Sequence, residues 1–343
     1  MKKLLNTLYV TTQGAYLARE GETVLVRVEK ETRLQLPIHT LSGIVCFGQV
    51  SCSPFLLGLC AERGVGVSFL TKHGRFLARV QGPVSGNVLL RREQYRRADD
   101  GAESAAMARS ILVGKIANSR TVLQRAIRDH SEKPGADVLE SAAKRLRFSL
   151  DQLQQSHPLD TLRGIEGDAA AVYFGVFDYL ITGQKDGFKF YERNRRPPLD
   201  NVNCLLSFVY TLLMHDVRGA LESVGLDPAV GFLHRDRPGR ASLALDIMEE
   251  FRPVLADRLV LSLINLGIVK KSGFRRTETG GIFMDDDTRK ALLVAYQKRK
   301  QEEINHPFLN EKVEIGLLPF AQALLLARHV RGDLDGYPPF IWR

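Results

Sequence analysis

A histidine and four acidic residues are the clearest candidates for chemistry in this sequence. His234 follows an apolar Gly-Phe-Leu, and a Pro-Gly turn then leads to a predicted helix that begins near residue 242. Because like charges on one helix face repel each other, acidic residues there destabilise the helix unless a cation or basic groups neutralise them. Helical spacing places four carboxylates on one face of this helix: Asp246, Glu249, Glu250 and Asp257.

Two interpretations of this acidic face are open on the residues alone. A solvated face neutralised by Arg252 and Arg258 needs no ligand. Pro253 favours a functional site, because a proline in a helix removes a backbone hydrogen bond at a cost of about 3 kcal/mol, and such irregularities gather at functional sites. Carboxylates with one imidazole suit Mg²⁺ or Mn²⁺, whereas structural zinc favours thiolates. Such a metal could polarise a phosphodiester and stabilise its attacking and leaving oxygens.

Glu166 is a further candidate, in the segment LRGIEGDAAAVYF. Its glycine neighbours and the three alanines that follow predict a helix that another backbone or a ligand can approach closely. Considered alone, this segment is better explained by tight helix packing with an exposed glutamate. The run Asp285 to Asp287 is explained by its place directly before a predicted helix, where acidic residues cap the N-terminus and complement its dipole.

Two regions with different patterns must position these residues, which predicts the α+β class. Residues 1–86 alternate apolar and polar residues between glycine turns, as in TVLVRV, and predict a β-strand domain with one short helix from about Ser53 to Arg63. Residues 87–101 predict a basic helix and linker. Residues 102–343 show the 3.6-residue spacing of amphipathic helices and predict an all-helical domain, with an extended tail because of Pro338 and Pro339.

Composition and charge describe a folded protein suited to a polyanionic partner. The 343 residues exceed the usual size of one hydrophobic core, and 44% apolar with 25% charged residues is typical of globular proteins. Residues 1–97 contain 14 Lys and Arg against 6 Asp and Glu, which places +8 of the net charge of +9 there. Such a region suits DNA, although many soluble proteins are basic. The four cysteines match neither a zinc nor a disulfide pattern, and we expect a cytoplasmic protein that does not enter membranes.

Four segments, in this order, carry a family resemblance: GIEGDAA, NRRPPLDNVNCLLSFVYTLL, GFLH and LALDIMEEFRP. Behind an N-terminal β-domain, their order and spacing resemble the CRISPR adaptation integrases, the first Cas protein, over nearly the full chain. The resemblance implies a β-sandwich-like N-terminal domain that mediates homodimerisation, followed by an all-α catalytic domain. It also implies a prokaryotic protein that pairs with the small second Cas protein, as two integrase dimers bridged by one partner dimer.

The resemblance also assigns roles to residues. The family's metal ligands are a glutamate in a Gly-Glu-Gly segment, a histidine after an aromatic-aliphatic pair and an acidic residue on the next helix. They fall on Glu166, His234 and Glu249, which would be the catalytic residues and bind Mg²⁺ or Mn²⁺; Ile165 departs slightly from the first pattern. Asp246, one turn before Glu249, matches an acidic position near the metal, which implies a supporting role.

Further residues have two open interpretations each. The helix with Asn203, Ser207 and Tyr210 on one side is implied to lie near the active site, and these polar groups either support the site or tie packed helices together. The tail GYPPFIWR is interpreted as a docking segment for DNA or the partner protein. A basic stretch around Tyr95 forms either a DNA-contacting helix or a solvated face, through Arg91, Arg92, Arg96 and Arg97.

The implied activity is the insertion of short foreign double-stranded DNA as spacers into a CRISPR array, an antiviral defence. The 3′-hydroxyl of the incoming DNA attacks a phosphodiester at the edge of a repeat. Such a transesterification needs alignment and charge stabilisation, which agrees with the lack of a convincing Ser-His-Asp or Cys-His set in the sequence. The alternatives are a stand-alone metal-dependent nuclease acting on branched DNA in repair and a non-enzymatic basic scaffold, against which the acidic helix face argues.

Overall fold

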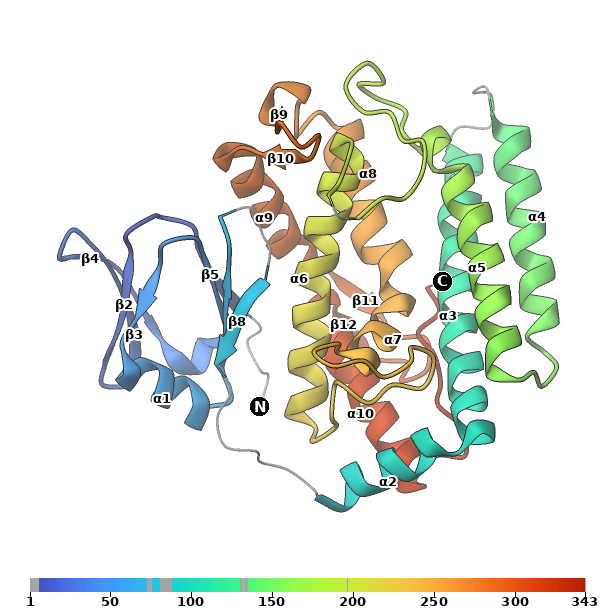
Figure 1. Ribbon diagram of the computed structural model, residues 1–343, viewed down its shortest axis with the longest axis horizontal. Helices are drawn as coiled ribbons and strands as arrows, with labels where there is room; N and C mark the ends of the chain where they lie inside the picture. The colour runs from blue at the N-terminus through green and yellow to red at the C-terminus, as the bar shows by residue number, and fades with distance from the viewer. Residues whose placement is uncertain are drawn as a thin grey trace. The chain divides into compact units, whose positions relative to one another are not determined.

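The computed structural model describes residues 6–72, 76–80, 88–129, 132, 135–195 and 197–342 (Figure 1). The chain divides into two compact units, residues 1–86 and 87–343. The first unit holds strands β1 to β8 and helix α1, and the second holds helices α2 to α10 with four short strands. This arrangement confirms the α+β fold class.

The N-terminal unit consists of two four-stranded sheets. The first has the order β1-β5-β7-β8, with β1, β5 and β7 parallel and β8 antiparallel to β7; its strands are Asn6–Val10, Leu41–Phe47, Gly66–Leu70 and Phe76–Val80. The second has the order β4-β3-β2-β6, and its strands are Glu31–Pro37, Thr23–Val28, Tyr16–Glu20 and Ser51–Cys52. A short 3₁₀ turn, Ile38–Thr40, precedes β5.

One apolar cluster joins both sheets, as in a β-sandwich. It contains Leu17 and Val24 from one sheet, Ile44 and Val67 from the other, and Leu56 from α1 (Pro54–Glu62). The side chain of Ser53 accepts a hydrogen bond from the backbone N–H of Leu56 at 3.2 Å, and proline occupies the first helical position. The expected start of this helix is therefore confirmed.

The second unit is mainly helical. Its helices are α2 Val88–Asp99, α3 Gly101–Asp129, α4 Ala136–Gln152, α5 Leu159–Gly175, α6 Asn201–Ser223, α7 Ser242–Phe251, α8 Arg258–Asn265, α9 Asp286–Lys300 and α10 Leu318–Arg331. Short 3₁₀ turns cover Phe177–Leu180, Lys271–Gly273 and Ile315–Leu317. Two antiparallel hairpins, absent from the sequence interpretation, pair β9 with β10 and β11 with β12: Phe274–Arg276, Ile282–Met284, Glu303–Asn305 and Lys312–Glu314.

The long helices α3 and α6 organise this unit. Helix α3 packs against α4, α5 and α7, and α6 packs against α7 and α10. Among the described helices, α6 alone is long and apolar enough to span a membrane, but 61% of that apolar window is buried inside the unit. We therefore interpret α6 as a core helix. The expected cap of α9 is confirmed, since Asp285 accepts from the backbone N–H of Thr288 at 2.8 Å.

The C-terminal tail is buried against its own unit. Phe340 is fully buried, and its backbone N–H donates to Glu250 Oε2 at 2.8 Å while its carbonyl accepts from Asn118 Nδ2 at 2.9 Å. Its ring lies 5.6 Å from that of Phe251, and Gln322 Nε2 donates to the carbonyl of Pro338 at 3.0 Å. The aromatic side chains and backbone groups of the tail join α3, α7 and α10, and a docking role for DNA or the partner protein stays a prediction.

Replacing Phe340 with alanine should destabilise the helical unit. The substitution leaves a cavity where α3, α7 and the tail meet, and such a change costs about 3–5 kcal/mol of unfolding free energy. Urea denaturation followed by circular dichroism measures the loss. Tyr191→Ala is the control, because Tyr191 is 80% exposed and its replacement should change stability by about 0.5 kcal/mol or less. Equal effects of the two substitutions would contradict the tail's structural role.

Candidate active site

Two of the predicted ligands meet one lysine. Lys115 on α3 forms ion pairs with Glu166 on α5 and with Glu249 on α7, the second at 2.8 Å between Nζ and Oε2. The side chains are 12%, 31% and 3% exposed for Lys115, Glu166 and Glu249. Because α3 packs on both α5 and α7, residues far apart in the sequence converge at this point.

Arg252 is a second cation on Glu249. Its Nη1 lies 2.5 Å from Glu249 Oε1, and its guanidinium lies 4.7 Å from the centre of the Tyr210 ring. Burial alone would raise the pKa of Glu249, but the charges of Arg252 and Lys115, with a smaller contribution from His234, lower that pKa to about 2. Glu249 is therefore ionised at neutral pH.

Close backbone packing fixes α3 beside α7 at this point. A Cβ atom on Gly114 would lie 3.1 Å from Glu250 Cγ and 3.3 Å from the carbonyl oxygen of Phe340, so a larger residue there would require these neighbours to shift. One turn along α3, Asn118 Nδ2 donates to the carbonyls of Glu250 at 2.7 Å and of Phe340 at 2.9 Å. Lys115 lies between these two contacts, which fix where its side chain starts.

Asp246 holds the loop that carries His234. Its carboxylate accepts the backbone N–H groups of Phe232, Leu233 and His234 at 2.6, 3.0 and 3.0 Å. Its Oδ1 also lies 2.6 Å from His234 Nδ1. An imidazole that donates from Nδ1 presents the lone pair of Nε2 to a ligand. The loop can lie this close because residue 231 is glycine, whose Cβ would lie 2.7 Å from Asp246 Oδ2.

Pro253 interrupts the helix, as the sequence predicted. Helix α7 ends at Phe251, and the chain continues as the π-helix Arg252–Asp257 before α8 begins. Proline cannot donate the hydrogen bond of a regular α-helix, and π-helical turns often occur at functional sites.

The predicted shared acidic face is wrong, and so is its interpretation as a solvated surface. All four acidic residues are buried. Each carboxylate has its own partners. Asp246 binds the His234 loop, and Glu249 binds the two cations. Glu250 binds the C-terminal tail, and Asp257 binds two tyrosine hydroxyls. Residue spacing predicts the direction of each side chain only for one regular α-helix, and the π-helix changes that spacing. Spacing also cannot predict the partners of these carboxylates, because the partners come from other elements.

The predicted supporting residues Asn203, Ser207 and Tyr210 gather around Arg193. Its Nη1 donates to Asn203 Oδ1 at 2.6 Å and its Nη2 to Ser207 Oγ at 3.1 Å, and its guanidinium lies 5.2 Å from the centre of the Tyr210 ring. The Tyr210 hydroxyl donates to Asp257 Oδ1 at 2.6 Å. Tyr210 therefore contacts both Arg193 and Arg252, which links this cluster to Glu249.

The four predicted DNA-contacting arginines lie on α2 and outside this centre. Two of them pair with Glu93, at 3.3 Å for Arg96 and 3.2 Å for Arg97. Gln94, on the same helix, is buried and donates to the carbonyls of Asp227 and Val230 at 2.8 Å each. Helix α2 therefore supports the segment that leads to His234. Arg92 and Arg96 are exposed, and Arg91 and Arg97 are partly buried.

The sequence analysis did not predict three features of the site: Lys115, Arg193 and the contacts of Arg252. Lys115 lies in GKIANSR, an ordinary amphipathic segment, and its partners are 51 and 134 residues away along the chain. Arg252 was considered only as a neutralising charge on an exposed face. The cluster RNRRPP was a usable signal for Arg193, because a basic run directly before a polar-faced helix favours contacts between the two.

The donor atoms suit a hard divalent cation, although no compact ligand group exists as the side chains stand. Within the described ranges, no three His, Cys, Asp or Glu side chains are close enough together to hold a metal ion. The Lys115 ammonium contacts both Glu166 and Glu249 instead. Glu249 Oε2 is buried and makes no hydrogen bond, only this ion pair. Two carboxylates and an imidazole are ligand types that fit Mg²⁺ or Mn²⁺.

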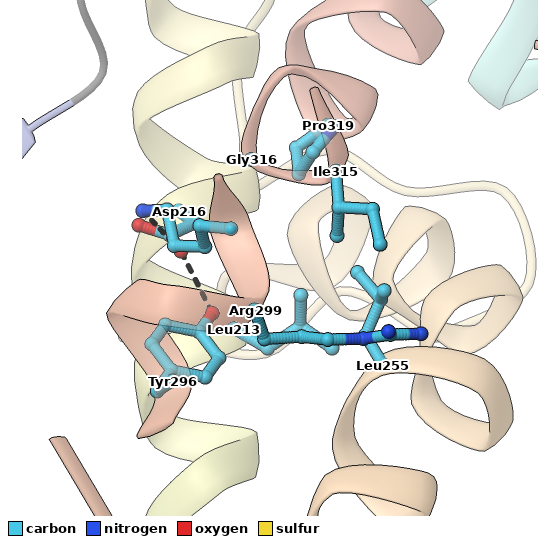
Figure 2. A pocket seen from close by; sticks show the side chains of 9 residues that line it. Leu213, Asp216, Leu255, Tyr296, Arg299, Ile315, Gly316 and Pro319 are labelled. Carbon is cyan, nitrogen blue, oxygen red and sulfur yellow. Dashed lines mark hydrogen bonds and ion pairs between the residues drawn. The ribbon is translucent and has the colours of Figure 1, made fainter. Parts of the chain in front are cut away.

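A separate small pocket lies among α6, α9, α10 and the turn at residues 315–317 (Figure 2). The Tyr296 hydroxyl donates to Asp216 Oδ2 at 2.7 Å, and Lys300 Nζ lies 2.9 Å from the same oxygen. Its lining residues include none of the predicted site residues. Tyr296 and Lys300 both bind Asp216, whereas Arg299 pairs with Glu302 outside the lining, and we interpret the pocket as a packing feature of the helical core.

Known proteins share both the sequence and the fold. The family model described as CRISPR associated protein Cas1 matches residues 8–298. CRISPR-associated endonuclease Cas1 1 of Chlorobaculum tepidum is 60% identical over 343 residues, which cover 100% of both chains. The fold resembles a casposase bound to integration product, with a TM-score of 0.84 and 21% identity over 99% of this chain and 95% of that one. It also resembles a chain of a Cas6-RT-Cas1–Cas2 complex, with a TM-score of 0.83 and 22% identity over 100% of this chain and 36% of that one. The chain belongs to the Cas1 family of CRISPR-associated proteins.

Proposed function

We propose that this protein is a metal-dependent DNA endonuclease and integrase that inserts short foreign DNA as spacers into a CRISPR repeat array. The observation that carries the proposal is the charged centre in which Lys115 pairs with both Glu166 and Glu249. The loop that carries His234 is held by Asp246, on the same helix as Glu249. The name of the 60% identical relative supports endonuclease activity. The shared fold with a casposase bound to integration product supports strand joining.

The reaction is a transesterification. The 3′-hydroxyl of the incoming DNA attacks a phosphodiester of the repeat, one P–O bond forms as another breaks, and the displaced strand leaves with a 3′-hydroxyl. Glu166, His234 and Glu249 would hold Mg²⁺ or Mn²⁺, which supplies charge stabilisation to the attacking and leaving oxygens when bound. Because one P–O bond replaces another, the reaction needs no covalent protein intermediate. The protein's task is to align the reacting groups and stabilise their charge.

The surrounding residues prepare the three ligands for this task. Asp246 fixes the orientation of the His234 ring through Nδ1 and holds the loop backbone. Arg252 and Lys115 keep Glu249 ionised in a buried place. Asn203, Ser207 and Tyr210 act through Arg193 and Arg252 and support the site as positioning groups.

DNA and a second Cas protein are the proposed partners, in the prokaryotic cytoplasm. The net charge of +8 in residues 1–97 suits double-stranded DNA, and Arg91, Arg92, Arg96 and Arg97 are candidate contacts to its phosphates. A solved relative of the same fold is named as part of a Cas1–Cas2 complex. We propose a homodimer formed through the N-terminal unit, with two such dimers bridged by one dimer of the partner. No observation favours a stand-alone repair nuclease or a non-enzymatic scaffold.

Glu166→Ala should abolish strand joining. The loss of a ligand removes charge stabilisation worth several kcal/mol, so we expect a decrease of roughly 100-fold or more. The assay follows the joining of a short duplex with 3′-hydroxyl ends to a repeat-containing plasmid, with the partner protein and Mn²⁺. The matched control is Glu140→Ala, because Glu140 forms an exposed surface pair with Lys144 at 2.9 Å and should leave the rate within about twofold. Full joining activity in Glu166→Ala would disprove the assigned centre, and cleavage that needs neither partner nor repeat would favour a repair nuclease.

Asp246→Asn should weaken metal binding while the unit stays folded. The two carboxylate oxygens of Asp246 accept the backbone N–H groups of the loop and contact His234 Nδ1, whereas asparagine has only one acceptor oxygen. The asparagine amide therefore cannot make all of these contacts and orients the His234 ring less firmly. Losses of such ligand-orienting groups reduce metal affinity by about 10–100-fold. Isothermal titration with Mn²⁺ measures the Kd, and Asp137→Asn, at an exposed position on α4, is the control. An unchanged Kd would show that Asp246 only holds the loop.

A further inference from the structure

Lys115 has surroundings that the proposed reaction does not yet explain. Its ammonium is bound by Glu166 and by Glu249, the two carboxylates proposed to hold a metal. The side chain is 12% exposed and comes from α3, an element that supplies none of the proposed ligands. A lysine this buried loses its hydration, so ion pairs must compensate for that loss.

The charges of the four directly paired side chains balance without any metal. Glu166 and Glu249 carry two negative charges, while Lys115 and Arg252 carry two positive ones. A divalent cation added to this group would leave an excess of positive charge in a poorly hydrated place, where charges interact strongly. It would also need the same carboxylate oxygens that Lys115 now contacts. One of the two side-chain cations must therefore give way.

Lys115 is better suited to move than Arg252. The Arg252 guanidinium lies over the Tyr210 ring and belongs to the π-helix, which limits its freedom. Lys115 has a flexible four-carbon stem ending in a compact charge with three donors. Its backbone is fixed by the packing of Gly114 and by Asn118, so the ammonium can swing while α3 stays in place.

We propose that Lys115 is the counter-cation of Glu166 and Glu249 in the metal-free enzyme, and that metal binding displaces its ammonium onto a phosphate oxygen of the bound DNA. The phosphodiester of the substrate is the anion that reaches this centre during the reaction. Lys115 is thus a further catalytic residue. Once its ammonium has left Glu166 and Glu249, that ammonium contacts the substrate phosphate. This inference rests on the proposed metal-dependent function.

The test compares metal binding with DNA joining in Lys115→Met. Methionine matches the four-atom stem of lysine without its ammonium, is well tolerated in helices and carries no charge. Isothermal titration of the full-length protein with Mn²⁺ alone should show a lower Kd than in the wild type, because no ammonium competes for the carboxylates. The expected decrease is on the order of 10-fold or more, since a like charge at about 4–6 Å shifts an ionic equilibrium by one to three decades.

The same variant should join DNA more slowly despite its tighter metal binding. Single-turnover joining at saturating Mn²⁺ should fall by roughly 10-fold or more, as expected for a lost charged contact to the reacting phosphate. Lys115→Arg keeps the charge and should recover part of the rate. Lys144→Met is the matched control, because Lys144 is an exposed partner of Glu140 at 2.9 Å, and it should change neither Kd nor rate.

The outcomes separate this inference from the proposed function. A Kd for Mn²⁺ in Lys115→Met that equals or exceeds the wild-type value would overturn the displacement, and an unchanged joining rate would overturn the phosphate contact. If Lys115→Met does not fold by circular dichroism, Lys115→Gln takes its place in the same titration. If the wild-type protein and Glu166→Ala bind Mn²⁺ equally well or not at all, the metal centre itself fails, and this inference fails with it.

Discussion

The pairing of Glu249 with two cations is the interaction on which the site depends. A buried carboxylate without partners becomes protonated, and a protonated acid is a poor ligand for a metal. Lys115 and Arg252 prevent this, and with His234 they lower the pKa of Glu249 to about 2. The protein thereby keeps a charged acid in a buried residue.

Much of the helical unit serves to keep these charges together. Helix α3 brings Lys115 to its partners because Gly114 allows close contact with α7 and Asn118 fastens α3 to Glu250 and Phe340. The C-terminal tail is thus part of the support for the site, although no residue of the tail is a proposed ligand. On the other side of Glu249, the Tyr210 ring holds Arg252 in place. Packing and electrostatics act on the same few residues.

Local signals in the sequence predicted the helices and strands well, but they could not predict contacts between residues that are distant in the sequence. The helix starts at Ser53 and Asp285 follow from capping residues whose partners lie three positions away. The family resemblance is the basis for proposing Glu166, His234 and Glu249 as metal ligands. Lys115 gave no such signal, because its partners come from two other helices. The acidic face failed for the same reason, since spacing along a helix does not show which other element receives each side chain.

The two cations on Glu249 have different chemistry, and this difference would let the proposed metal centre be stable both before and after a metal binds. Arg252 is fixed by a ring contact and by the π-helix, so its charge on Glu249 is constant. Lys115 shares its charge between Glu166 and Glu249 and holds them only through its ammonium. A centre with two fixed cations would exclude a metal, and one with none would hold two unneutralised buried acids. One fixed and one exchangeable cation avoid both problems.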